Sequence, residues 1–266
     1  MKVNILFYPI ILIITFSCIT TKNALKDFNN AEYFDAANKF EKTIKETDAK
    51  NNYLLAESLR KSNRLWQAEK YYKNAINYGI NDEMAYYYLV LSLKANNNYD
   101  EADSTIINYL KNAKNESVIS LINKEAIYIK NLKKYPDTSY YSVKNLKAIN
   151  TTFAEYSPSF SNDKLYFVSN RLSEKIYSGT GTPFTDLYEV KTRGANVDIN
   201  SLKKLEDNIN QEKVNEGSIT FSADGTYMIF AKGNDGKSSG RNNVDLYWSR
   251  YRRGGWTNPR LVNVNT

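Results

Sequence analysis

The sequence predicts an α + β multidomain chain, in which an N-terminal α-solenoid is followed by an incomplete, two-blade β-propeller. Up to about position 134, apolar residues recur with helical spacing and a period near 34 residues. After about position 152, alternating segments recur roughly every 60 residues, a period typical of propeller blades or of a β-solenoid. Only Gly79 of the 11 glycines lies before position 178, so tight turns are expected mainly in the second part.

The first eighteen residues have the pattern of an export signal. Met1-Lys2 supplies a basic start, residues 3–16 are mostly apolar, and Ser17 precedes Cys18. The apolar run is shorter than the ~20 residues needed to span a bilayer. The lone cysteine resembles that of a bacterial lipoprotein signal, which implies that residues 1–17 are removed and that Cys18 is acylated. An ordinary secretory signal or an uncleaved anchor is the alternative.

Helical pairs are expected within residues 18–134. Three segments each carry an alanine followed four positions later by a large apolar residue: Ala36 and Phe40, Ala68 and Tyr72, Ala102 and Ile106. The small residue lets two helices approach, and the larger one fills the gap beside it. This spacing resembles tetratricopeptide (TPR) repeats and implies a TPR-like α-solenoid, with a plain helical bundle as the alternative. A last helix near 117–133 is expected to cap the stack through Val118, Leu121, Ile122, Ala126, Ile129 and Leu132.

A partner-binding face is expected along the first helix of each pair. Solenoids of this kind bind along such a face, which here would be lined by Tyr53, Glu57, Arg60, Tyr87, Leu91 and Lys94. Aromatic residues beside single charges suit a peptide or protein ligand. A solvated helix surface without a partner is the alternative.

Two β-hairpins are predicted in the second part. Residues 156–171 and 216–231 both alternate up to a phenylalanine, Phe160 or Phe221, and resume the alternation after a short polar break. Asp224-Gly225 allows the positive φ of a tight turn, and the shorter first break requires a tighter turn still. A matching strand follows each hairpin, at 186–190 and 245–249. These segments resemble the PD40 (WD40-like) blades of TolB-type propellers, which implies like surroundings for the two phenylalanines; a β-sandwich is the alternative.

Domain boundaries follow from these patterns. The residue before a proline avoids the helical region, so Pro136 ends the helices and 135–151 is expected to be a linker. The region 152–266 would hold blades at about 152–205 and 215–264, closing with strands at 202–205 and 260–264, with polar loops at 172–185 and 232–244. Two blades cannot close a ring that typically has four to eight. We therefore expect more blades in a longer protein, or another chain covering the open edges.

The composition argues against several chemistries. The chain has no histidine and its only cysteine is Cys18, so Ser-His-Asp and Cys-His nucleophile systems are excluded. Zinc prefers nitrogen and sulfur ligands, and no EF-type spacing of acids occurs, including at Asn234-Asp-Gly236. The net charge of +7 is dispersed over the chain and does not form a nucleic-acid-binding arm. We expect no enzyme, no metal or other cofactor, and no nucleic-acid partner.

The order of a lipoprotein signal, TPR-like repeats and PD40 blades resembles the OmpA-family outer-membrane lipoproteins. The segments 145–151 before Glu155, and 208–210 before Glu216, make the likeness closest to the PorE-like component of the type IX secretion and gliding machinery. The resemblance implies a non-catalytic scaffold on the periplasmic face of the outer membrane, bound to envelope and secretion-complex proteins. That family holds peptidoglycan through a C-terminal OmpA-like domain absent from this sequence, so no residue here is assigned to peptidoglycan.

Two other classes of function are alternatives to the scaffold. A ligand-binding sensor would hold a glycan or peptide in the central channel of a closed propeller ring. A propeller-associated peptidase would need a catalytic domain after Thr266, and none of these residues supplies one.

Overall fold

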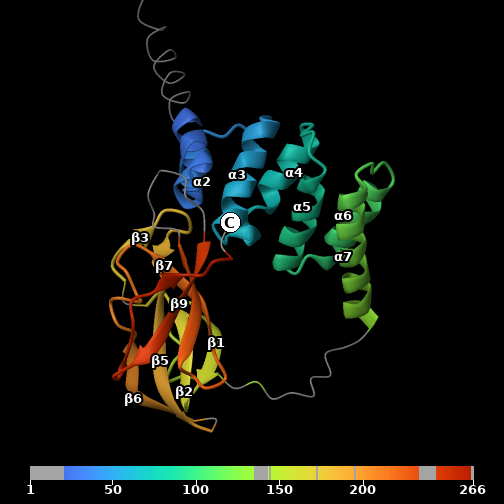
Figure 1. Ribbon diagram of the computed structural model, residues 1–266. Coiled ribbons are helices and arrows are strands. Elements are labelled where there is room, and N and C mark those ends of the chain that lie inside the picture. Colours follow the sequence, from blue (N-terminus) through green and yellow to red (C-terminus); the bar gives the residue numbers. More distant parts are fainter. Residues whose placement is uncertain are drawn as a thin grey trace, which may run out of the picture. The chain divides into compact units, whose positions relative to one another are not determined.

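The computed structural model describes residues 21–134, 143, 145–171, 173–194, 196–233 and 244–264. The chain divides into two compact units, Met1–Ser142 and Val143–Thr266, and each is described by itself. Helices form the first unit and antiparallel sheets form the second, so the predicted mixed α + β fold is confirmed (Figure 1). The predicted lipidation site at Cys18, most of the predicted linker and the turn at 234–236 lie outside the described residues.

Consecutive helices pack side by side in the first unit. Residues 21–29 are helical and are followed by α2 (Tyr33–Glu41), α3 (Ala49–Lys61), the 3-10 helix η1 (Leu65–Gln67), α4 (Glu69–Asn77), α5 (Met84–Ala95), α6 (Tyr99–Leu110) and α7 (Glu116–Lys134). Each helix from α2 onward contacts the next, and α7 also contacts α5 (Figure 1). No described helix is long and apolar enough to cross a bilayer.

The repeated alanine and large-residue pairs lie in one shared core, as the sequence predicts. Their six members are almost wholly buried: Ala36, Phe40, Ala68, Tyr72, Ala102 and Ile106. The prediction for the last helix is right for Val118, Ile122 and Ile129, which are buried, and wrong for Leu132, which is 42% exposed. Because α7 has 19 residues and both α5 and α6 have 12, its last turns extend past the helices that it packs against.

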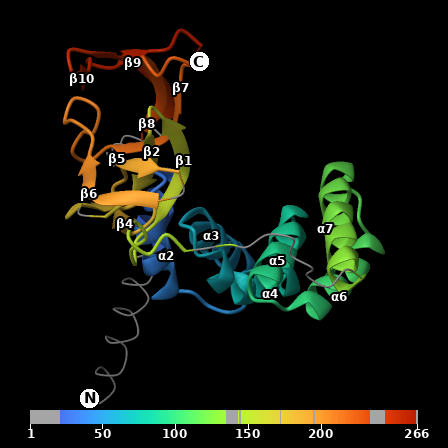
Figure 2. The same cartoon turned by 90° about the horizontal axis from the view of Figure 1, so that it is seen from below.

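The second unit contains two larger antiparallel sheets (Figure 2). The first sheet has the order β1-β2-β5-β6, formed by β1 (Glu155–Ser161), β2 (Lys164–Ser169), β5 (Asp186–Arg193) and β6 (Asn196–Lys204). The second contains β7 (Asn215–Phe221), β8 (Tyr227–Gly233) and β9 (Val244–Arg252), with β10 (Gly255–Trp256) and β11 (Arg260–Leu261) both paired to β9. Both predicted hairpins and both following strands are present.

Two of the segments between these strands differ from the prediction. The expected loop at 172–185 contains a small hairpin of β3 (Ile176–Tyr177) and β4 (Thr182–Pro183). The closing strand expected at 202–205 is the end of the longer β6, which turns back directly from β5. Strands of two residues carry too little alternation to be recognised in a sequence, which accounts for β3 and β4.

The hairpin turns have the conformations that their lengths require. Asn162 and Asp163 form a two-residue turn with φ of 49° and 55°, the combination that matches the twist of a tight hairpin. The longer second turn places Gly225 at φ 67°, where a glycine avoids the clash of a Cβ atom. The first turn is therefore the tighter one, as predicted.

The two sheets begin with the same local arrangement of backbone and side chains, which we call the frame. Ser157 and Ser218 both have positive φ, at 51° and 42°, and both stand at an irregularity in the pairing of the first strand. Each frame also has a glutamate carboxyl group beside a cation from the second strand or the residues directly after it: Glu155 beside Arg171, and Glu216 beside Lys232.

Each of these cations also holds the segment that precedes its sheet. Arg171 Nη2 donates to the Ile149 carbonyl at 2.6 Å, and Lys232 Nζ donates to the Ile209 carbonyl at 3.2 Å. The backbone amide two residues after each isoleucine in turn donates to the glutamate carboxyl group of that frame. The sequence repeat therefore corresponds to equivalent side-chain and backbone contacts at the start of each sheet.

One face of each sheet contributes to a shared core, and this makes the prediction for Phe160 and Phe221 wrong. Phe221 packs its ring 4.4 Å from the Tyr166 ring and 5.9 Å from the Trp256 ring, measured between centroids. Phe160, at the same place in the first sheet, is 68% exposed. Tyr166 of the first sheet packs on Phe221 and shields it from solvent. No described residue shields Phe160 in the same way.

Candidate functional site

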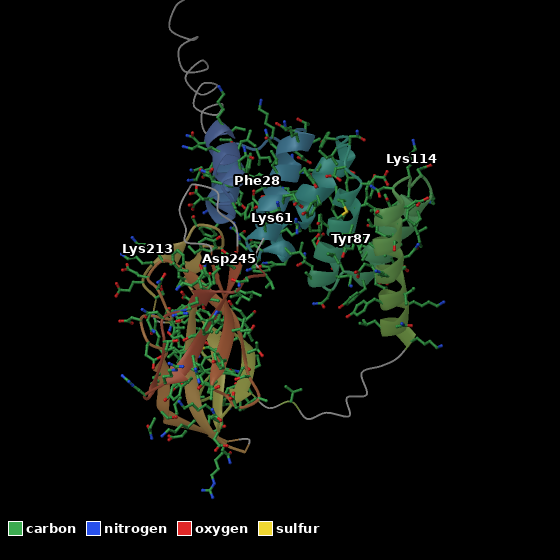
Figure 3. The ribbon with its side chains drawn as sticks, in the orientation of Figure 1. Phe28, Lys61, Tyr87, Lys114, Lys213 and Asp245 are labelled. Carbon is green, nitrogen blue, oxygen red and sulfur yellow. The ribbon has the colours of Figure 1, made fainter. Side chains whose placement is uncertain are left out.

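The six residues predicted to bind a partner lie on α3 and α5. Tyr53, Glu57 and Arg60 are spaced i, i+4 and i+7 on α3, which puts them on one side of that helix. The residues Tyr87, Leu91 and Lys94 have the same spacing on α5. Figure 3 shows Tyr87 on this helix. All are half-buried except Glu57, which is only 6% exposed.

On α3, hydrogen bonds fix the Glu57 carboxylate. It accepts two from the Arg60 guanidinium, at 3.0 and 2.6 Å, and one from the Tyr72 hydroxyl at 2.6 Å. Burial, together with the Glu57 charge, raises the pKa of Tyr72 far above its ordinary value. The guanidinium then lies 3.9 Å from the centroid of the Tyr88 ring on α5, so it connects the two helices through a cation–π contact.

Tyr53 holds α3 to the start of α5. Its hydroxyl donates to Asp82 Oδ2 at 2.7 Å, and the other oxygen of that carboxylate accepts from the Met84 amide at 2.9 Å. Burial and the bond to Asp82 raise the pKa of Tyr53 well above its ordinary range. The hydroxyl is therefore protonated at any physiological pH and serves as a donor.

The row continues onto α7, through two residues that the sequence interpretation missed. Lys94 forms an ion pair with Glu125 and places its ammonium 3.9 Å from the centroid of the Tyr128 ring. Tyr128 is 48% exposed. Glu125 and Tyr128 stand 34 positions after Leu91 and Lys94, the spacing that also separates Leu91 and Lys94 from Glu57 and Arg60. Extending the repeat period once more would have found them.

The chemistry of this row is that of recognition. Its tyrosine hydroxyls are hydrogen-bond donors, its cations are paired, and its rings offer apolar area at a small cost in side-chain entropy. Among the residues that the structure describes, no group of three or more acids or cysteines is placed to hold a metal ion. We call the residues Tyr53, Glu57, Arg60, Tyr87, Leu91, Lys94, Glu125 and Tyr128 the helical row.

The second unit has a polar hollow of about 550 Å³ beside the start of β5. It is lined by Ser173, Glu174, Lys175, Phe184, Asp186, Lys204, Asp207, Asn210, Gln211, Glu212 and Lys213. Burial raises the pKa of Asp186, and its carboxylate forms an ion pair with Lys204 at 2.8 Å. Lys213 lies on the connection from β6 to β7 (Figure 3). Charges of both signs line the hollow, so it favours a polar ligand.

A scan against protein-family models and a search of the curated proteins both give no match. The function is therefore inferred from the residues and their contacts.

Proposed function

We propose that this chain is a non-catalytic scaffold that binds another protein along its helical row, with its first unit acting as a TPR-like α-solenoid. The observation that supports this most directly is the continuity of the row over three helices. Arg60 contacts Tyr88 on α5, and Lys94 contacts Glu125 and Tyr128 on α7. A face built at a regular interval, with aromatic rings held by paired charges, suits an extended peptide segment of a partner.

The second unit is proposed to be two blades of a β-propeller. The support is the repeated antiparallel pairing, together with the frame in which a carboxyl group, Glu155 or Glu216, lies beside a cation. With the sequence resemblance to PorE-like, OmpA-family lipoproteins, these features favour partners among envelope and secretion-complex proteins. We place the protein on the periplasmic face of the outer membrane, anchored through a lipid on Cys18.

The binding proposal is tested by capture from an envelope extract. The full chain is compared with the double variant Tyr87→Ala, Tyr128→Ala, and with a control, Ile107→Ala, Tyr78→Ala. Tyr78 and Ile107 are also exposed and lie outside the row. Truncating central aromatic anchors costs about 2 kcal/mol or more at an interface, so recovery of an identified envelope protein should fall roughly thirtyfold. Equal recovery by both variants would contradict the proposal.

The anchor is tested separately by fractionation. Two or three acyl chains contribute about 0.8 kcal/mol per buried CH₂, which makes membrane attachment stable. Cys18→Ala should therefore move the protein from the membrane fraction to the soluble fraction, with an unchanged circular dichroism spectrum. If the variant still sediments with membranes, lipidation at Cys18 does not anchor the chain.

The polar hollow favours a second candidate, a sensor that binds a glycan or a short peptide. Titration calorimetry with a chitooligosaccharide and with a tripeptide tests this directly. Binding lost in Lys204→Glu and kept in Lys203→Glu, whose side chain does not line the hollow, would favour the sensor. If neither probe gives a measurable heat of binding, the scaffold is favoured.

A further inference from the structure

Equivalent strands of the two sheets differ in which faces are covered. On β2 every residue from Leu165 to Ser169 is buried, so this strand is covered on both faces. On β8 the residues alternate, with Met228 and Phe230 buried and Tyr227 and Ile229 exposed. Ile229 is 39% exposed, whereas Tyr166, at the same place in the first sheet, is 4% exposed.

The first strands show the reverse difference. On β7, Ile219 is 7% exposed and Phe221 packs on Tyr166. On β1, the equivalent positions are Pro158 and Phe160, and both are exposed. The cover that protects the β7 positions is the first sheet itself, because Tyr166, Val168 and Leu187 share one core with Ile219 and Phe230.

The chain therefore exposes two surfaces, one on β1 and one on β8. They correspond to the two sides of the contact between its own sheets. We name the exposed positions Pro158 and Phe160 the β1 face, and the exposed positions Tyr227 and Ile229 the β8 face. Inside the unit, Ile219 and Phe221, which are equivalent to the β1 face, pack in one core with Tyr166, which is equivalent to Ile229 of the β8 face. Because both sheets are built on the same frame, a β1 face has the side-chain spacing to fit a β8 face.

We propose that a second copy of this chain places its β1 face on the β8 face of the first, repeating the internal packing of the two sheets. The contact is head-to-tail, since two different surfaces meet, so further copies add in the same direction until a ring closes or a filament grows. Phe160 of one copy would lie beside Ile229 of the next, as Phe221 lies beside Tyr166 within the chain. This surface is separate from the helical row.

Cross-linking between two differently labelled full chains tests the proposal. Cys18→Ser removes the only native thiol, after which one chain carries Phe160→Cys and the other carries Ile229→Cys. A short bis-maleimide should join the mixed chains into a heterodimer. The matched control replaces Phe160→Cys with Ile176→Cys, a position of similar exposure, 59% against 68%, on the β3–β4 hairpin.

A charge on the β1 face supplies the decisive comparison. Adding Pro158→Asp to the Phe160→Cys chain places a carboxylate against the β8 face, and the heterodimer should fall about tenfold or more, since an unpaired charge is costly to bury. Pro158 is exposed within the single chain, so the fold is kept, and circular dichroism checks this. A yield no higher than the Ile176→Cys control, or one insensitive to Pro158→Asp, would overturn the proposal.

Discussion

Two equivalent carboxyl groups of the second unit have opposite protonation behaviour. Burial raises the pKa of Glu216 to about 8, and Lys232, at 3.5 Å, offsets this only in part. One Glu216 oxygen, Oε2, has no hydrogen-bond partner in the structure. At Glu155 burial acts in the same direction, but hydrogen bonds from Thr151 and the Arg171 charge leave the pKa below its ordinary value. The environment decides the charge of each carboxyl group.

Stability should therefore depend on pH through Glu216. In the folded chain this carboxyl keeps its proton up to about pH 8, whereas its ordinary pKa is 4.5. The contribution of Glu216 to the unfolding free energy is fully present below pH 4.5 and is lost as the pH rises toward 8. Between pH 5 and 8 the wild type should lose about 2–4 kcal/mol more unfolding free energy than Glu216→Gln.

Urea unfolding at several pH values measures this difference. The control is Glu212→Gln, which neutralises an exposed acid on the same connection between β6 and β7; it should follow the wild-type pH dependence. Parallel curves for the wild type and Glu216→Gln would show that Glu216 is ionised in the folded chain.

At the scale of the element, helix ends show which local interactions define a boundary. The N-cap residue directly before helix α3 is Asp48, whose side chain accepts a hydrogen bond from the Asn51 amide at 3.0 Å. The N-cap residue before helix α2 is Glu32, whose side chain forms no such bond. A cap of this kind satisfies an amide that has no partner within the helix.

Asp48→Ala should lower the unfolding free energy by about 0.5–2 kcal/mol, because the first turn of α3 loses its cap. Glu32→Ala at the start of α2 should change it by no more than about 0.5 kcal/mol, since it removes no capping bond. Denaturant midpoints of the two variants, compared with the wild type, measure both effects. A larger loss for Glu32→Ala than for Asp48→Ala would contradict this account of the helix ends.

Period and alternation predicted most elements, and the failures have physical reasons. The hairpins were predictable because a half-buried strand alternates at every second residue. The start of β6 also carries this signal, with Val197 and Ile199 between polar residues, although the interpretation did not use it. The β3–β4 hairpin carries no usable signal, because its strands are two residues long.

At the scale of the whole molecule, a repeat in sequence specifies the same frame but not the same neighbours. The core of the helical unit was predictable because each repeat packs on the next, so Phe40, Tyr72 and Ile106 are all buried. Most of the helical row followed from the same period, and its last members were missed because α7 was interpreted only as a cap. The repeat could not predict the burial of a residue that is shielded from solvent by the preceding repeat.

This distinction predicts unequal effects from equivalent substitutions. Phe167→Ala and Phe230→Ala should each cost about 3–5 kcal/mol, because both rings are buried, Phe167 in the core of the first sheet and Phe230 in the core shared by the two sheets. Phe221→Ala should cost about 2 kcal/mol or more, because the ring loses its packing against Tyr166. Phe160→Ala should cost less than about 0.5 kcal/mol, since the ring is largely in solvent.

Equilibrium unfolding in urea of the four single variants tests this, at protein concentrations low enough to keep chains separate. The two buried rings act as matched controls for the general cost of losing a phenylalanine from a sheet. The difference between positions 221 and 160 then measures how much one sheet shields the next from solvent. If Phe160→Ala is as costly as Phe221→Ala, position 160 is covered in solution, and the two repeats have the same surroundings after all.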